Sequence, residues 1–191
     1  MTSLIDPELI LFQNQFVTVF HAPIKETTKV YTVVTARGGA GASVLVILPP
    51  NDTCAESRIL VLAQNRPPIG GESWELPAGA VDDGETGLVA AQRELFEETG
   101  VLIHEDFLVP LGNFHSSPTL AKDTVYLYAA VLPADFDINS VVIQEDEIDD
   151  YRWIPVSELL EETMTNESFS VTIPSSLMKA RKLGLIESLG L

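Results

Sequence analysis

Cysteine is nearly absent from this sequence: Cys54 is the single one among 191 residues, so an internal disulfide is excluded. It lies in a polar stretch without a CxxC motif or a Cys/His cluster, and we interpret it as an incidental thiol, which fits a reducing cytosol. Long apolar runs are also lacking. None approaches the roughly 18 residues that a membrane span requires, and the N-terminus has no basic segment followed by an apolar one. The sequence therefore predicts a cytoplasmic protein without a membrane partner.

Basic residues are scarce as well. Eleven Lys and Arg residues stand against 28 Asp and Glu residues, which gives a net charge of −17. Nucleic acid is excluded as the natural partner, because contacts to a phosphate backbone need Lys and Arg. A small phosphorylated substrate is not excluded, since a bound divalent cation reverses the local sign of the charge. The length, with 46% hydrophobic and 20% charged residues, is typical of one globular domain.

What the sequence does contain is one informative acidic stretch, Gly79 to Val101, which reads GAVDDGETGLVAAQRELFEETGV. A Gly-rich acidic turn is followed by good helix formers, and Gly100 is expected to end the helix as its C-cap. Glu94, Glu97 and Glu98 stand at i, i+3 and i+4. On a helix this spacing puts all three carboxylates on one face.

Three carboxylates so close together repel one another unless a positive charge lies among them. A hard cation with oxygen ligands is the usual partner, and Mg²⁺ needs few protein ligands because it keeps waters and accepts phosphate oxygens. The alternative is a solvated acidic face with an ion pair between Arg93 and Glu97 at i, i+4. The wider pattern favours the metal site.

The stretch resembles the signature of the Nudix hydrolases: Gly, five residues, Glu, seven residues, Arg-Glu, an apolar residue, any residue, Glu-Glu, any residue, Gly, and an apolar residue. The resemblance implies that Glu94, Glu97 and Glu98 bind Mg²⁺, with Mn²⁺ as a substitute, and that Glu97 and Glu98 are catalytic. It also implies that Arg93 pairs with Glu85 to brace the loop before the helix and serves catalysis in this way. Every fixed position of the signature is filled, by Gly79, Glu85, Arg93, Glu94, Leu95, Glu97, Glu98, Gly100 and Val101, of which Gly79, Glu85 and Gly100 are expected to give structural support.

The segment before the signature, WELPAG over 74–79, resembles a string found in ADP-ribose and related ADP-sugar pyrophosphatases of that family. It implies that Glu75 contacts substrate or orders the site, and that the carbonyl of Ala78 coordinates metal. Trp74 is a candidate for substrate binding or an ordinary core aromatic. Gln-Asn-Arg over 64–66 also resembles their Gln-Tyr/Phe-Arg. We predict that Arg66 binds phosphate, which arginine grips with two hydrogen bonds; the alternative is an ordinary surface arginine.

A loop expected over 113–123 carries further candidates. Ser117 and Pro118 resemble the start of a Ser-Pro-Gly motif in ADP-ribose pyrophosphatases, and Ser117 is therefore expected to bind substrate. Thr119 stands where glycine is usual, which weakens the choice of ADP-ribose over other nucleoside diphosphate sugars. His115 is either a general base or, as lone histidines more often are, a structural or exposed side chain.

A second loop, QEDEIDD over 144–150, is very acidic. Taken alone it is typical of a solvated run of charge. The resemblance implies that this loop supplies a glutamate that positions the attacking water or binds a further metal. Glu145 and Glu147 are both candidates for this catalytic role.

The remaining sequence reads as alternating strands and helices, which indicates an α/β class. The resemblance implies the Nudix α/β/α sandwich around a mixed central sheet. We expect residues 1–35 to form an N-terminal β-hairpin extension, a small β-subdomain, and residues 36–191 to form the Nudix hydrolase domain. The N-terminal part commonly contributes to a homodimer in ADP-sugar pyrophosphatases, so a homodimer is expected. Strands are predicted at 15–21, 29–35, 42–48, 58–63, 107–111 (an edge strand), 124–132 and 153–155, and helices at 88–99, at 156–163 with Ser157 as N-cap, and from 174 to about 183.

The function implied by the resemblance is Mg²⁺-dependent hydrolysis of the pyrophosphate bond in a nucleoside diphosphate derivative. ADP-ribose or another ADP-sugar is the expected substrate, giving AMP and a sugar phosphate, with a glutamate as general base. Phe16 or Tyr31 of a partner chain are candidates for stacking on the adenine. Two alternatives stay open: a Nudix hydrolase of a nucleoside triphosphate, a dinucleoside polyphosphate or coenzyme A, and a non-catalytic module that senses nucleotides or binds a protein.

Overall fold

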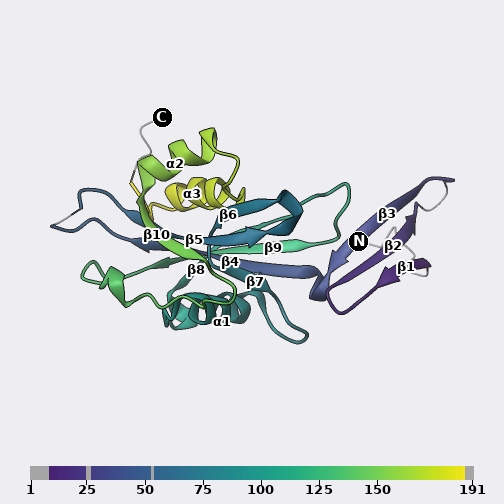
Figure 1. Cartoon of the computed structure of the whole chain (residues 1–191), viewed down its shortest axis with the longest axis horizontal. Coiled ribbons are helices and arrows are strands. Elements are labelled where there is room, and N and C mark those ends of the chain that lie inside the picture. Colours follow the sequence, from purple (N-terminus) through teal and green to yellow (C-terminus); the bar gives the residue numbers. More distant parts are fainter. Residues whose placement is uncertain (1–8, 25–26, 53, 188–191) are drawn as a thin grey trace.

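A computed structural model of the chain describes residues 9–24, 27–52 and 54–187. It consists of a large body, in which helices cover a central sheet, and a small separate sheet at one end (Figure 1). The small sheet comes from the N-terminal residues. None of the described helices has the length and the hydropathy needed to cross a lipid bilayer.

The central sheet is mixed, as predicted. Its main path runs in the order β10-β5-β4-β9-β8, with β6 paired to β5 and β7 paired to β4. The central pair β4 and β9 is parallel, and the other pairs are antiparallel. The strands are β4 (Ala40–Leu48), β5 (Arg58–Arg66), β6 (Gly71–Glu75), β7 (Ala78–Ala80), β8 (Leu108–Phe114), β9 (Thr124–Val131) and β10 (Asp150–Pro155).

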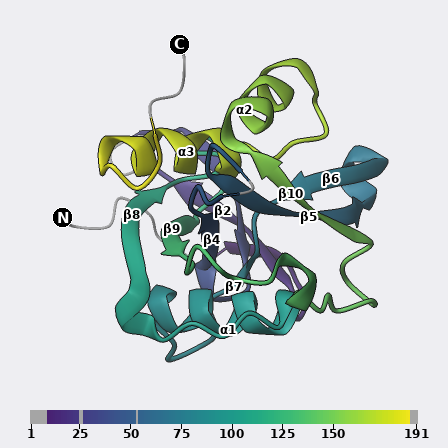
Figure 2. The ribbon, with the colours of Figure 1, turned by 90° about the vertical axis from the view of Figure 1, so that its left-hand side faces the viewer.

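Helices cover both faces of this sheet, which confirms the predicted sandwich (Figure 2). Helix α1 (Gly87–Thr99) lies on one face, and α2 (Val156–Thr165) and α3 (Thr172–Lys182) lie on the other. Each face has its own core, because neighbouring residues of the apolar strands β4 and β5 point to opposite sides. Short 3₁₀ helices occupy the connections at Arg37–Gly39, Pro67–Ile69, Glu105–Phe107 and Ile138–Ser140.

The N-terminal sheet contains three antiparallel strands, β1 (Leu9–Gln13), β2 (Val17–Pro23) and β3 (Val30–Ala36). The β2–β3 hairpin is the one predicted from the sequence, whereas β1 comes from a segment that carried no strand prediction. Residues 1–8 of the expected extension lie outside the described residues. The sheet is tied to the body by main-chain hydrogen bonds of Val34, whose N–H donates to Leu120 O at 2.9 Å and whose carbonyl accepts from Lys122 N at 2.8 Å.

Several element boundaries differ from the predicted ones. Ser157 is not the N-cap of α2, because the helix already begins at Val156 and Pro155 is the capping residue. The carboxylate of Glu56 replaces the missing cap: it accepts the N–H of Ser157 at 3.2 Å and its hydroxyl at 3.0 Å. The predicted edge strand is confirmed as β8, and β6 and β7 are strands without a sequence prediction.

Candidate active site

The signature helix α1 is held firmly at both ends. Thr86 caps its start by accepting the N–H of Val89 at 3.3 Å. Gly100 caps its end in the left-handed region with φ 68°, as predicted, and donates its N–H to Phe96 O at 2.8 Å. Leu95 is fully buried against the sheet. The buried stripe fixes the rotation of the helix, so the face with Glu94, Glu97 and Glu98 is fixed as well.

Arg93 connects four groups around this face. Its Nε and Nη2 donate to the two carboxylate oxygens of Glu85 at 3.0 and 2.9 Å. Its Nη1 donates to Glu94 Oε1 at 2.7 Å and to Glu97 Oε2 at 3.0 Å, and its Nη2 also donates to Ala80 O at 2.9 Å. The hydrogen bond from Arg93 is the main reason why the pKa of Glu85 lies below its ordinary value. The brace between Arg93 and Glu85 and the i, i+4 pair with Glu97 are therefore both present.

Glu98 is the most deeply buried of the three glutamates, with 3% of its surface exposed. Its Oε2 accepts the N–H of Ala78 at 2.9 Å, and its Oε1 accepts from Gln64 Nε2 at 3.2 Å. Burial raises the pKa of Glu98 to about 8, and the nearby charges of Glu94 and Glu147 raise it further against the opposing hydrogen bonds. None of the ion pairs between described residues involves this carboxylate. The carboxyl group of Glu98 is therefore held in place by neutral donors and without a cationic partner.

Glu94 lies with its carboxylate directly against the backbone of Gly79, so closely that a Cβ at position 79 would overlap with it. Burial raises the pKa of Glu94, opposed by Arg93 and reinforced by the charges of Glu97 and Glu147. Glu97 is more open, with 48% of its side chain exposed. Glu94 and Glu98 therefore lie against the 78–79 backbone, whereas the contact of Glu97 is with Arg93, and the three carboxylates are respectively half-buried, buried and exposed.

These residues fit a hard divalent cation. All the candidate metal ligands are oxygen atoms, and the buried Glu98 has no cationic partner. Because Gly79 has no side chain, the carboxylate of Glu94 can lie against the same backbone segment that Glu98 contacts. Within the described residues no three Asp, Glu, His or Cys side chains form a ready-made metal cage. A cation at this place would therefore use one or two carboxylates together with water and phosphate oxygens, which suits Mg²⁺.

Arg66 lies at the end of β5 and forms a two-pronged ion pair with Glu75. Its Nε and Nη2 donate to Glu75 Oε1 and Oε2, each at 2.9 Å. This pairing is the main cause that raises the pKa of Arg66, and the charges of Glu98 and Glu147 add to it. Arg66, predicted to bind phosphate, and Glu75, predicted to contact substrate or order the site, are therefore paired with each other near the carboxylates of α1.

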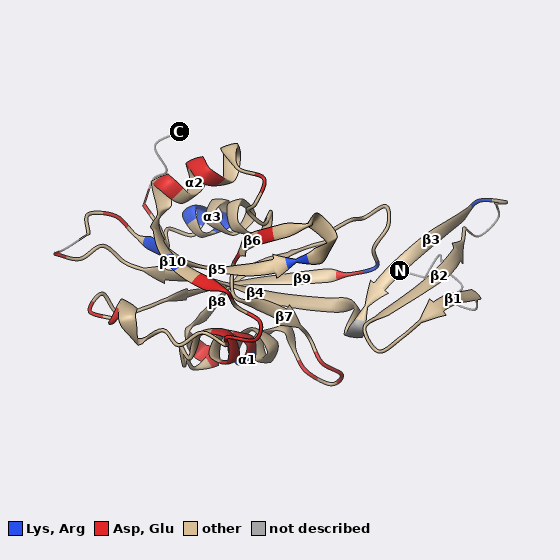
Figure 3. Ribbon diagram, in the orientation of Figure 1, with Lys and Arg blue, Asp and Glu red and all other residues tan. Residues whose placement is uncertain are grey.

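The acidic loop before β10 is anchored against α1. The N–H of Gln144 donates to Glu98 O at 3.4 Å, Ile148 is buried with 2% exposed, and the N–H of Asp149 donates to Ala63 O at 2.9 Å. This anchoring brings Glu147 within electrostatic reach of Arg66, Glu94 and Glu98, whose pKa values it raises. Figure 3 shows the acidic residues of this loop and of α1 running close together.

Trp74 does not lie in the open site. It is 5% exposed, belongs to the core on the side of α2 and α3, stacks on Phe169 and is covered by Arg152, whose guanidinium carbon is 4.2 Å from the ring centroid. Of the two roles predicted for Trp74, its position agrees with that of a core aromatic and not with contact to substrate, because neighbouring protein groups already cover the ring.

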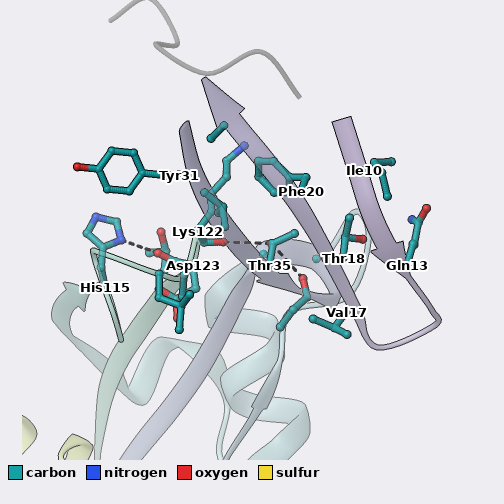
Figure 4. Close-up of a pocket in the computed structure, with 18 of the residues that line it drawn as sticks. Ile10, Gln13, Val17, Thr18, Phe20, Tyr31, Thr35, His115, Lys122 and Asp123 are labelled. Carbon is teal, nitrogen blue, oxygen red and sulfur yellow. Dashed lines mark hydrogen bonds between the residues drawn. The ribbon is translucent and has the colours of Figure 1, made fainter. Parts of the chain in front are cut away.

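A groove of about 1120 Å³ opens between the N-terminal sheet and the loop over 115–124 (Figure 4). Its lining residues include Phe16, Tyr31 and His115, but no carboxylate of α1. The ring of His115 bonds through Nδ1 to the carbonyl of Asp123 at 2.5 Å. Ser117 lies in the same loop, where its carbonyl accepts the N–H groups of Leu120 and Ala121. Of the two candidates of this loop, His115 lines the groove, whereas Ser117 is not among its lining residues.

Gln64 is a site residue for which sequence reasoning provided no role. Its amide reaches Glu98 from the end of β5, and it is 6% exposed. The sequence contains a signal for this contact, because side chains at every second position of a strand point to the same face. Gln64 is therefore on the same face of β5 as Leu60 and Leu62, which pack toward α1. A polar residue at the end of such a buried row has to find a partner on that face.

Comparison with known proteins gives a match to the NUDIX domain over residues 39–173. Similar proteins include the methanol dehydrogenase activator of Bacillus methanolicus (33% identical; 56% of this chain and 56% of the relative covered) and the ADP-sugar pyrophosphatase of Mus musculus (38%; 44% and 39% covered). The ADP-ribose pyrophosphatase of Bacillus subtilis is 31% identical, with 54% of this chain and 52% of the relative covered. Proteins named RNA pyrophosphohydrolase and 8-oxo-(d)GTP phosphatase match at comparable identity.

The chain spans about half the length of these curated relatives. The domain match covers most of the chain and includes β4 to α2 and the whole signature, and the sandwich with its glutamate-bearing helix agrees with it. The chain therefore belongs to the Nudix family.

Proposed function

We propose that this protein hydrolyses the pyrophosphate bond of ADP-ribose or another ADP-sugar and releases AMP and a sugar phosphate. The observation that carries the proposal is that Glu94 and Glu98 both lie against the 78–79 backbone, with Arg93 bonded to Glu94. The names of two relatives, ADP-sugar pyrophosphatase and ADP-ribose pyrophosphatase, support the choice of substrate class.

The protein ligands of Mg²⁺ would come from Glu94, Glu97, Glu98 and the carbonyl of Ala78, with one or two of the carboxylates bound at a time and water and phosphate oxygens completing the set. When bound, the metal supplies charge neutralisation for the diphosphate and lowers the pKa of a coordinated water. Arg93 bridges the carboxylates of Glu94 and Glu97 and orients them, because its Nη1 donates to both. The protein thus provides an anionic pocket whose geometry exists before the substrate arrives.

Glu147 is the general base in this proposal. It takes a proton from the attacking water, whose oxygen forms a new bond to one phosphorus while the bridging P–O bond breaks and the other phosphate leaves. This role for Glu147 is supported by its closeness to Glu94 and Glu98, whose pKa values its charge raises. Arg66 binds a phosphate oxygen at the rim by turning from Glu75, and arginine is suited to such exchange between carboxylate and phosphate.

We further propose that the protein is a homodimer joined through the N-terminal sheet. Large apolar side chains of this sheet are exposed in the single chain, and a dimer interface would cover them. Light scattering after size exclusion is expected to give twice the mass of 20.8 kDa. The exposed residues are Leu9, Ile10, Leu11, Phe12, Phe16, Val30 and Tyr31.

The test is a substrate panel measured with Mg²⁺ and with EDTA. It contains ADP-ribose, ADP-glucose, UDP-glucose, GDP-mannose, a dinucleoside polyphosphate, 8-oxo-dGTP and a 5′-triphosphorylated RNA. Fastest metal-dependent turnover of an ADP-sugar, with AMP as product, supports the proposal. Fastest turnover of a triphosphate moves the substrate to the class named by other relatives. No turnover of any member contradicts the enzymatic function.

A further inference from the structure

The carboxylates of the signature helix differ in what holds them. Glu94 and Glu97 are both bonded to the guanidinium of Arg93, a full positive charge. Glu98 instead receives one neutral donor on each oxygen, the backbone N–H of Ala78 at 2.9 Å and the side-chain amide of Gln64 at 3.2 Å. A neutral donor orients a carboxylate without cancelling its charge, whereas a cation orients it and cancels the charge.

Gln64 is placed on rigid structure for this task. It belongs to β5, which pairs with β6 on one side, where Gln64 lies opposite Ser73, and with β10 on the other. Its side chain is almost fully buried. The amide therefore has little freedom to move away from Glu98, and the amide in turn restricts the rotation of the Glu98 carboxylate.

We propose that Gln64 is a positioning residue that holds the carboxylate of Glu98 in the orientation needed to bind the divalent cation. This inference rests on the proposed function, in which Glu98 is a metal ligand. Gln64 acts through Glu98 and touches neither the metal nor the substrate. Residues that orient a metal ligand typically contribute about 10- to 100-fold to metal affinity.

The variant that tests the proposal is Gln64→Met, which keeps an unbranched side chain of similar length and removes the amide. The chain offers a matched control in Gln92, a residue of α1 whose Nε2 donates to the carbonyl of Ile103 at 2.7 Å. Gln92→Met removes the same kind of hydrogen bond with the same substitution, away from the carboxylates. Gln64→Asn, whose amide is one methylene too short, is measured in parallel so that a folding defect in one variant leaves the test intact.

The measurement is the dissociation constant for Mn²⁺, obtained from the EPR signal of free Mn²⁺ without substrate. Gln64→Met and Gln64→Asn are expected to weaken binding by at least about tenfold, and Gln92→Met by less than about twofold. In the Glu98→Gln background, Gln64→Met is expected to cause no further loss, because its effect passes through Glu98. Saturating Mg²⁺ is expected to restore kcat in Gln64→Met while the half-saturating Mg²⁺ concentration rises.

Two different failures can be told apart. If the wild-type protein binds Mn²⁺ and both Gln64 variants bind it equally well, Gln64 is merely structural and the inference is wrong. Equal losses in the Gln64 and Gln92 variants would also overturn it, because the effect would then come from general destabilisation. If the wild-type protein itself binds no Mn²⁺, the metal-dependent function fails first and the inference fails with it.

Discussion

The carboxylate of Glu94 occupies the space in which Gly79 would carry a side chain. The first glycine of the signature and the first of its clustered glutamates, 15 positions apart in the printed sequence, therefore fit together as a single contact. The contact explains why the segment that supplies the Ala78 carbonyl and the helix that supplies Glu94 can approach so closely. It also gives the metal-site proposal a steric test that changes no charged group.

Gly79→Ala should displace the Glu94 carboxylate, because the new methyl group overlaps with it. A displacement of about 1 Å in a catalytic group can cost roughly 100-fold, and we expect a fall of that order in kcat/KM. Gly71→Ala is the matched control, since a Cβ there meets nothing within 4 Å. Steady-state kinetics on both variants are the measurement, and full activity of Gly79→Ala would contradict the steric account.

Arg93→Lys should fail to replace arginine although it preserves the charge. Lysine has one ammonium group, whereas the guanidinium bonds to Glu85, Glu94 and Glu97 in separate directions. Losing one or two charge-assisted hydrogen bonds of this partly exposed group should cost about 2 kcal/mol, or roughly 4–8 °C in Tm. Arg181→Lys, on α3, makes the same substitution away from the carboxylates and is the control. A Tm for Arg93→Lys within one degree of the wild type would refute the proposed brace.

Glu147→Gln and Glu145→Gln should have very different effects. The charge of Glu147 raises the pKa of Glu94 and of Glu98, and Glu147 is the proposed general base. Removing a general base costs roughly 10²- to 10³-fold in kcat. We expect Glu145→Gln to change kcat by less than about threefold since, unlike Glu147, Glu145 is not among the charges that raise the pKa of Glu94 and Glu98. The measurement is kcat at saturating substrate and Mg²⁺. The reverse order of the two losses would assign the base to Glu145.

The burial of Glu98 predicts a pH dependence for the stability of the metal-free protein. Its pKa is raised from 4.5 to about 8 on folding, so between these values the native chain keeps a proton that the unfolded chain has released. The contribution of Glu98 to the free energy of unfolding is therefore complete below about pH 4.5 and is lost as the pH rises through about 8. Charge repulsion elsewhere in this acidic chain acts in the same direction, so Glu98→Gln is the reference.

The measurement is Tm against pH for the wild type and Glu98→Gln, each without metal. Between about pH 5 and pH 8 the wild type should lose several degrees more than the variant. Adding Mg²⁺ should raise the wild-type Tm more at pH 8 than at pH 5, because metal and proton compete for the same carboxylate. Identical pH profiles for the two proteins would show that Glu98 is not buried as described.

Local patterns in the sequence predict those parts of the fold that depend on neighbours along the chain. The helix that ends at Gly100 follows from helix formers and a capping glycine, and the edge strand β8 follows from Pro110, which cannot donate to a ladder. The start of α2 at Val156 agrees with the predicted range, but the predicted N-cap, Ser157, is wrong because the capping carboxylate comes from Glu56, about a hundred residues earlier. A single sequence has no signal for such a distant partner.

The candidate site shows the same division. The Arg93–Glu85 pair was predicted through the signature, and the structure contains it. The partnership of Arg66 with Glu75 and the hydrogen bond from Gln64 to Glu98 were not predicted, because both depend on how β5 lies against β6 and α1. The sequence does not decide between the two roles of Trp74, because the burial of its ring depends on Phe169 and Arg152, which come from distant segments.

The most direct test of the metal-dependent function is the rate of AMP release from ADP-ribose as Mg²⁺ is titrated, for the wild type and for Glu98→Gln. The account predicts a saturable dependence on Mg²⁺ and no release in EDTA for the wild type. For Glu98→Gln it predicts a loss of roughly 100-fold or more at equal Mg²⁺. AMP release that continues in EDTA, or that survives unchanged in Glu98→Gln, would contradict the central claim that the glutamates of α1 form a catalytic metal site.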